Sequence, residues 1–398
     1  MTPTDPGASL EALNQLLSQF SDITGYKINT DKSVILPFHL SGEETAQFTA
    51  LYGFKVSTTS IPYLGINLTI SYVDLYKGNY SPLFAQLRRD LEAWDKDCIS
   101  CLGRIHCIKM NLLSCLLYLF QALPVPVDPS DLTFLQSNID AFVWRQGRHR
   151  VARNTLYCSR ESGGLGLPNL LQYYHAAQLT QIVAAHSPPS SKRWVDFEAA
   201  LMWPDDIRFR IWLSRRDRPP LVTLCPTILH VFSLWDKLSL KKGLCDVISS
   251  LMPLWRNRRF VPGLQPTPFG NLANCALYHI WDMHLGGHLV TFDMLSDRVT
   301  LSPRDFFWYL QLCHFITQLE IRQGAEASLT SFECLCLTGS SPKRLISLLY
   351  ASLMSSKGSV VLSYMTAWKK ELGSDIEGDD WEEIWEATRK VSICTTLQ

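Results

Sequence analysis

The sequence predicts a mainly α-helical protein with a small α+β segment at its N-terminal end. Three observations predict this fold class. Apolar residues recur at helical spacing through most of residues 75–186, and two short β-branched runs stand near the start. Hydrophobic residues make up 46% of the 398 residues and charged residues 19%, which is typical of a folded globular chain. The length is enough for two or three domains.

The first segment, residues 1–72, combines helices with strands. Residues 9–24 carry a periodic row of apolar side chains, and Gly25 stands where that helix should stop. A strand is expected near residues 32–38 and a short helix near 43–54. Residues 61–70 are typical of a strand, in which Gly65 indicates a bulge or a close backbone approach. The periodic row of the first helix is Leu10, Leu13, Leu16, Leu17 and Phe20.

The second segment, residues 73–186, is predicted to be a bundle of four or more helices. Two helices each show a single apolar face, a third spans residues 128–144 behind an Asp or Ser cap, and a fourth follows the glycine turn at 163–166. The first apolar face comprises Leu83, Leu87, Leu91 and Trp94, and the second comprises Ile105, Ile108, Leu112, Leu116 and Leu119.

The third segment, residues 187–398, is predicted to be irregular, rich in Trp and Pro, and mostly helical. Proline-rich stretches around residues 203–226 and 261–270 favour an extended, irregular course. Helices are expected near residues 302–319 and 342–354 and again from residue 365.

Net charge and cysteine content limit the kinds of binding partner and the cellular compartment that are expected. The 37 basic and 37 acidic side chains cancel, so any surface for a polyanion must be local. Twelve irregularly spaced cysteines in a chain without a signal sequence favour reduced thiols in the cytoplasm or nucleus and not secretion. The longest apolar run, residues 112–127, is shorter than the ~20 residues that span a bilayer, so no membrane segment is expected.

No catalytic residue, metal site or small-molecule cofactor site is predicted. The doublets Asp205–Asp206 and Asp379–Asp380 lie beside helix starts, where Asp commonly caps. Cys98, Cys101 and His106 approach the spacing of a zinc knuckle, but the segment continues a helical apolar period, which favours free cysteines. Signatures of a nucleophile elbow or a phosphate loop are absent from the sequence.

One stretch carries a local positive charge. Its five arginines fall within sixteen residues, contain no carboxylate between them, and are flanked by Trp144 and Tyr157. Guanidinium groups pair with phosphate oxygens and aromatic rings stack on bases, so the stretch is a candidate nucleic-acid contact. A solvated loop between two helices is the alternative. The five are Arg145, Arg148, Arg150, Arg153 and Arg160.

Five segments occur in an order that resembles the reverse transcriptase of vertebrate non-LTR retrotransposons (LINEs), within their second open reading frame polyprotein. They begin with GYKINTDKS and IPYLGINLT and continue with LYKGNYSPLFAQLRRDLEAW. GRIHCIKMNLLSCLLYLFQALP and the stretch from FVWRQGRHR to GGLGLPNLLQYYHAAQLTQI complete the order. The resemblance covers residues 5–186, and weaker similarity continues to near residue 325.

The resemblance implies a fold and a set of roles. Residues 1–72 would be the end of the polymerase palm, residues 73–186 a helical thumb, and residues 187–398 part of the C-terminal region. Lys32 would lie near the incoming nucleotide, and Tyr63, Leu64 and Gly65 would form a primer grip. Arg104, Lys109 and the arginine stretch would contact the backbone of an RNA or DNA template-primer. A flanking surface charge is the alternative for Lys109.

The family's catalytic Asp pair, which binds Mg²⁺ in the intact enzyme, is expected upstream of residue 1. By itself the chain is therefore expected to bind nucleic acid, with the element's own RNA as one candidate, and not to polymerise. Two alternatives stay open. The chain is a retrotransposon-derived pseudogene product without selected activity or a helical scaffold, or it is part of an active reverse transcriptase whose upstream part was left out of the gene prediction.

Overall fold

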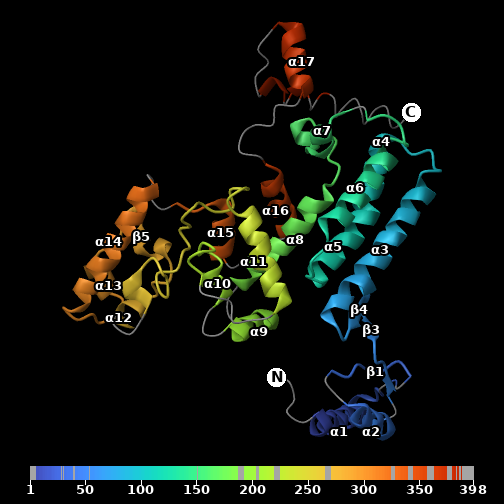
Figure 1. The fold of residues 1–398 in the computed structure, drawn as a ribbon, viewed down its shortest axis with the longest axis horizontal. Coiled ribbons are helices and arrows are strands. Elements are labelled where there is room, and N and C mark those ends of the chain that lie inside the picture. The colour runs from blue at the N-terminus through green and yellow to red at the C-terminus, as the bar shows by residue number, and fades with distance from the viewer. Residues whose placement is uncertain are drawn as a thin grey trace. The chain divides into compact units, whose positions relative to one another are not determined.

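The computed structural model describes residues 6–27, 29, 31–38, 41–52, 54–149, 151–186, 192–202, 206–218, 225–264, 270–323, 328–338, 344–355, 363–373, 379–381, 383–384 and 387. Helices account for most of the regular structure (Figure 1), which confirms the predicted mainly α class. Strands within these ranges form three separate two-stranded sheets.

The chain divides into two compact units, Met1–Trp94 and Asp95–Gln398. Each is described by itself below. The boundaries after residues 72 and 186 that the sequence indicates stay predictions.

The first unit alternates helices with very short strands. Its elements are α1 (Pro6–Thr24), β1 (Val34–Ile35), α2 (Gly42–Tyr52), β2 (Lys55–Val56), β3 (Ser60–Tyr63), β4 (Ile66–Thr69) and α3 (Tyr72–Trp94). Helix α1 ends at Gly25, whose φ of 73° suits a residue without a Cβ. Helix α2 begins with a capping box, in which Ser41 and Glu44 exchange hydrogen bonds between side chain and backbone N–H. Strands β1 and β2 pair in parallel.

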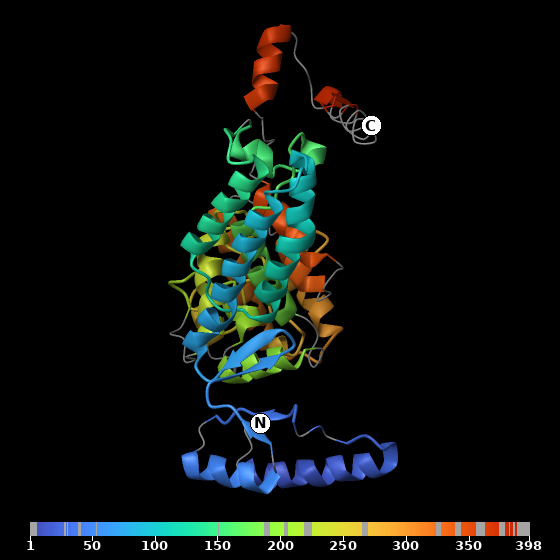
Figure 2. The ribbon, with the colours of Figure 1, turned by 90° about the vertical axis from the view of Figure 1, so that its right-hand side faces the viewer.

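Residues 60–69 form a β-hairpin and not the single bulged strand that the sequence indicated. Strands β3 and β4 pair antiparallel, and Leu64 and Gly65 make the turn with φ of 48° and 80°. Two consecutive positive φ values are the geometry of a type I′ turn, whose twist matches that of paired strands. Gly65 therefore closes a turn. The hairpin lies against α3 (Figure 2), where Asn67 and Asn79 exchange hydrogen bonds of 2.8 and 2.9 Å.

The second unit begins with helices from the range predicted to be a bundle, whereas α3, the first helix of that range, belongs to the first unit. The elements of this range in the second unit are α4 (Cys101–Cys107), the π-helical turn η1 (Ile108–Leu112), α5 (Leu113–Ala122), α6 (Pro129–Val143), α7 (Arg153–Tyr157), the 3₁₀ turn η2 (Arg160–Ser162) and α8 (Leu170–Ala185). The apolar face predicted for residues 105–119 is buried at every position. Asp128 caps α6 through the Ser130 N–H, and Asn169 caps α8 through the Gln172 N–H. The periodicity did not indicate the π turn that interrupts this helix.

Helix α8 lies at the centre of this bundle. It contacts α5, α6, α11 (Pro226–Leu238) and α16 (Leu345–Met354). The Tyr174 hydroxyl holds the proline-rich segment that follows α5, because it lies 3.2 Å from both the Val125 oxygen and the Val127 nitrogen. The Tyr173 ring stacks on Tyr350 of α16 with 3.8 Å between ring centroids. Residues far apart in sequence are thus joined through one helix.

By length and composition, one helical segment within the described ranges, Cys101–Ala122, could cross a membrane. Buried helices in the core of a soluble protein meet the same criteria. Its apolar face packs inside the unit, with Ile105, Ile108, Leu112 and Leu116 fully buried. The segment therefore indicates no location by itself.

The remainder of the second unit is built from short helices around two hydrophobic clusters. One cluster joins α8 to α9, α10, α11, α15 and α16, and the other joins α12, α13 and α14. The further elements are α9 (Arg193–Met202), α10 (Ile207–Arg210), η3 (Val261–Leu264), α12 (Gly270–Ala273), η5 (Ile280–Met283), β5 (His284–Leu285), β6 (His288–Leu289), α13 (Phe292–Ser296), α14 (Asp305–Gln323), α15 (Ser331–Thr338) and α17 (Ser363–Leu372).

Several expectations for this part are confirmed. Helices α14, α16 and α17 match those predicted near residues 302–319, 342–354 and beyond 365. Asp206 caps α10 by accepting a 2.8 Å hydrogen bond from the Arg208 N–H, as its place beside a helix start indicated. Asp205 lies outside the described residues.

The glycine turn before α8 gives a test of the fold. A Cβ at Gly164 would lie 2.2 Å from the Cys158 carbonyl oxygen, so Gly164→Ala must displace backbone. We expect a loss of about 1–3 kcal/mol in the free energy of unfolding, measured by urea denaturation. Gly42→Ala is the control, because a Cβ there meets nothing within 4 Å. Equal midpoints for Gly164→Ala and the wild type would contradict the packing of this turn.

Candidate nucleic-acid interface

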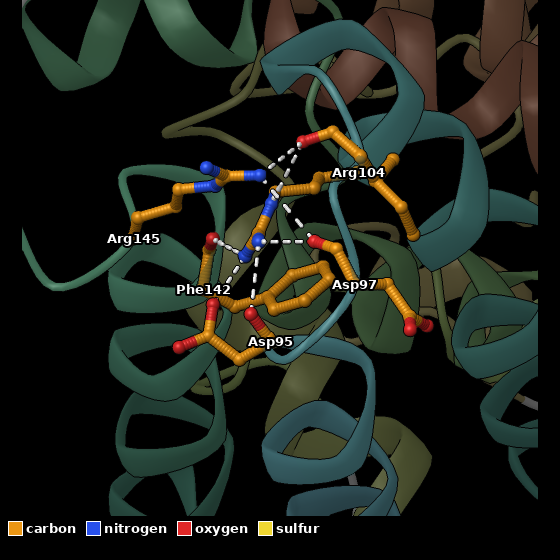
Figure 3. A network of polar contacts seen from close by, with 6 residues as sticks. Asp95, Asp97, Arg104, Phe142 and Arg145 are labelled. Carbon is orange, nitrogen blue, oxygen red and sulfur yellow. Dashed lines mark hydrogen bonds and ion pairs between the residues drawn. The ribbon is translucent and has the colours of Figure 1, made fainter.

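The predicted backbone-contact residues divide into structural arginines and surface cations. Arg104 belongs to the first group (Figure 3). Its side chain is fully buried, and its Nη1 group donates to the Asp95 carboxylate and, over 2.7 Å, to the Phe142 carbonyl oxygen. The remaining donors reach the carbonyl oxygens of Asp95, Asp97 and Ile99 at 3.3 Å. All five guanidinium N–H groups can thus find an acceptor.

These contacts make Arg104 a structural residue. The Arg104 guanidinium also lies over the Phe142 ring, 4.5 Å from its centroid. The edge of the guanidinium therefore makes hydrogen bonds while its face contacts an aromatic ring. Contact with a phosphate would require the group to leave the core and to abandon Asp95. The role that the resemblance implied for Arg104 is therefore at odds with its burial, because a matched segment does not show which way the side chain points.

Arg145 supports the same segment from the surface. Its backbone lies in the left-handed region with φ of 49°, and its Nη2 group donates to the carbonyl oxygens of Asp97 and Ile99 at 3.3 Å (Figure 3). The side chain stays exposed. Arg145 therefore fixes the loop before α4 while part of its guanidinium remains open to solvent.

The two arginines give a paired prediction. Arg104→Ala removes a fully buried guanidinium and the donor to the Asp95 carboxylate, and loss of a hydrogen bond to a charged group costs about 1.5–3 kcal/mol. Arg145→Ala removes hydrogen bonds at an exposed site, which costs about 1 kcal/mol. Urea denaturation of both variants should rank them in this order. Equal losses would show that the Arg104 network is no more important than a surface contact.

The rest of the arginine stretch is spread along the loop and α7. Arg153 pairs with the buried Asp140 over 3.2 Å. Burial raises the pKa of that carboxyl, and the hydrogen bond from Gln136 and the charge of Arg153 oppose this only in part. Arg148 is exposed and has no partner among the described residues. Arg150 lies outside them.

Two cationic side chains and a histidine come together elsewhere in this unit, and we call His106, Lys109 and Arg160 the cationic cluster. The Nη2 atom of Arg160, in η2, lies 3.0 Å from Nε2 of His106, in α4. A Cβ added to Gly166 would lie 3.2 Å from the Lys109 ammonium and 4.0 Å from Cγ of Arg160. The bare backbone of Gly166, whose φ is 68°, therefore leaves room for both side chains.

The cluster is electrostatically uncompensated within the described part of the chain. Burial, Arg160 and Lys109 together lower the pKa of His106, and burial and Arg160 lower the pKa of Lys109. A guanidinium can only donate, so Nε2 of His106 must accept and the imidazole is neutral. Among the described residues, no carboxylate acts on either pKa. The arrangement favours an anion between these side chains.

Sequence reasoning found two members of the cluster and missed the third. His106 drew attention only as a zinc ligand. The signal that could have found it is the spacing of His106 and Lys109, three residues apart on one predicted helix and therefore on one face. Arg160 comes from a turn more than fifty residues later, and only the fold brings it to that face.

The pKa of His106 can be tested directly. Because Arg160 lowers it, Arg160→Ala should raise the pKa of His106 toward its ordinary value of about 6.5. The measurement is an NMR titration of the imidazole between about pH 8 and about pH 5. Arg298→Ala, at an exposed arginine after α13, is the control that removes the same charge elsewhere. An unchanged pKa in Arg160→Ala would contradict the contact.

The residues matched to polymerase motifs lie in the first unit. Lys32 is exposed in a turn, where its backbone N–H donates to the carbonyl and side-chain oxygens of Asn29 at 3.1 Å. Tyr63 and Leu64 stand at the tip of the hairpin and are 59% and 75% exposed, and Gly65 completes the turn. Their side chains are thus available to a partner, and their nucleotide and primer roles stay predictions.

No group of three or more His, Cys, Asp or Glu side chains in the described ranges could hold a metal ion. Cys98 and Cys101 form no disulfide, and neither do the other described cysteines. His106 is directed to Arg160, which is not a metal ligand.

A separate pocket of about 640 Å³ lies in the second unit, and Lys192, Trp194, Glu198 and Arg344 are among its lining residues. Burial raises the pKa of Glu198 to about 7, against the opposing effect of a hydrogen bond with Thr227. The charge of this pocket therefore changes near neutral pH. It is distinct from the cationic cluster in every residue.

No known family model matches the chain. The resemblance to LINE-type reverse transcriptases rests on the ordered sequence segments.

Proposed function

We propose that the chain binds the sugar–phosphate backbone of nucleic acid, as an RNA or DNA template-primer, through the cationic cluster. The observation that carries this proposal is the meeting of His106, Lys109 and Arg160 without a carboxylate among the described residues that act on them. Phosphate oxygens are the common anionic partner of such groups. The resemblance to a polymerase thumb supports the choice of a nucleic acid over another polyanion.

The proposed contact is local and independent of sequence. The chain as a whole carries no net charge, so long-range attraction does not supply the affinity. Lys109 and Arg160 are half-buried, which strengthens their interaction with an anion relative to fully solvated cations. Arg148, exposed and without a described partner, would add a second backbone contact.

The proposal assigns binding to this chain and not polymerisation. In the family that the sequence resembles, two Mg²⁺ ions held by carboxylates supply the chemistry, and none of the described carboxylates is assigned that role here. By resemblance, Lys32 would lie near a nucleotide, and Tyr63 to Gly65 near a primer end. We also propose that the chain is located in the cytoplasm or nucleus and that the element's own RNA is one of its ligands.

The test is binding of a single-stranded oligonucleotide across a salt series. Wild-type affinity should fall with salt, and Lys109→Ala combined with Arg160→Ala should reduce the slope of log K against log salt by about 1.4, at about 0.7 for each phosphate contact. The loss should be similar for oligonucleotides of different sequence. Fluorescence anisotropy with a labelled oligonucleotide measures both effects.

Arg298→Ala is the matched control, because it removes an exposed arginine outside the cluster. It should leave slope and affinity near wild type. Affinity that does not respond to salt would reject backbone binding and would favour a product without selected activity.

A further inference from the structure

We propose that the cationic cluster is a site for a terminal phosphate group, the phosphate monoester at the end of a nucleic-acid strand, in preference to an internal phosphodiester. This inference rests on the proposed function and adds the chemical class of the bound group. It is carried by the number, spacing and mutual repulsion of the three side chains.

The number of donors matches a phosphate monoester. Lys109 and Arg160 donate through ammonium and guanidinium groups, and His106 donates once Arg160 turns from its Nε2 atom to a ligand and the imidazole takes up a proton. A monoester offers three terminal oxygens, one for each of these side chains. An internal diester offers two non-bridging oxygens, so two of the three side chains would have to share one oxygen.

The charge also favours a monoester. Lys109 and Arg160 already carry two positive charges near Gly166, and burial together with the charge of Arg160 lowers the pKa of Lys109. A monoester carries a charge of about −1.5 to −2 at neutral pH and offsets more of the positive charge of Lys109, Arg160 and a protonated His106 than a diester, which carries a single negative charge. The remaining repulsion therefore discriminates between the two ligands.

The backbone of the glycine turn beside the cluster is held by its own hydrogen bonds and offers no N–H group to a ligand. The N–H groups of Gly163, Gly164, Leu165 and Gly166 are all engaged with carbonyl oxygens of residues 155–160. Lys109 lies in the π turn η1, which interrupts the helix between α4 and α5, and such turns occur frequently at functional sites. Recognition would come from the side chains, with the loop as a fixed support.

The experiment compares one short single-stranded DNA in three forms: with a 5′-phosphate, with a 3′-phosphate, and with hydroxyl groups at both ends. The full chain should bind a phosphorylated form about tenfold more tightly than the hydroxyl form, as expected for added hydrogen bonds to a charged group. The two phosphorylated forms show which end is preferred. Inorganic phosphate should compete with the phosphorylated end and so remove the difference in affinity between the phosphorylated and hydroxyl forms.

Three variants assign the preference to the cluster. Lys109→Ala and Arg160→Ala should abolish the advantage of the phosphorylated ends. Arg160→Lys should keep the charge and the salt dependence but weaken the advantage, because the planar fork is lost. Arg298→Ala should retain it. Urea midpoints near wild type show that the variants are folded.

The outcomes separate this inference from the proposed function. Salt-dependent binding that is equal for all three forms overturns the terminal-phosphate site and leaves backbone binding in place. A preference that survives in Lys109→Ala and Arg160→Ala also overturns it, because the end is then recognised elsewhere. Absence of binding to every form rejects both proposals.

Discussion

The buried guanidinium of Arg104 is the interaction on which the first bundle of the second unit depends. It joins the segment Asp95–Ile99 to the C-terminal end of α6, through the Asp95 carboxylate and the Phe142 carbonyl oxygen. The Arg104 side chain itself is fully buried, so its guanidinium depends on these acceptors in place of water. The start of α4 is thereby fixed, and with it the direction in which every later residue of that helix points.

Because the start of α4 is fixed, residues 105–109 place some side chains in the core and others at the surface. Ile105 and Ile108 are fully buried, whereas His106 is exposed and Lys109 half-buried beside Gly166. The partner cation, Arg160, arrives from a turn held by backbone hydrogen bonds between residues 155–160 and the glycine loop. The cationic cluster thus rests on two rigid supports, and none of its members depends on a flexible loop to find the others.

Sequence periodicity predicted the helices well, because a helix with one buried face has apolar residues at regular three- and four-residue intervals. The faces through Leu87 and Leu91 and through Ile105 to Leu119 are buried as predicted. It failed where geometry depends on partners remote in sequence. Arginine spacing could not distinguish the buried Arg104 from the exposed Arg148, and Gly65 indicated a break in a strand without revealing that Leu64 shares its left-handed conformation. The proximity of His106 to Arg160 is a product of tertiary packing alone.

The relative orientation of α4 and α5 depends on the number of residues in the π turn η1 between them. A π turn holds one residue more than the α-helical turn that it replaces, which corresponds to about 100° of helical phase. Helices α4 and α5 are therefore offset, with Arg104 on one side of the turn and the buried Leu116 on the other. Loss of a single residue here would rotate one helix against the other, so that the Arg104 network, the apolar face and the approach of Lys109 to Gly166 could not all persist. A change in the number of residues here would therefore disturb all three features at once, whereas a substitution acts at one position.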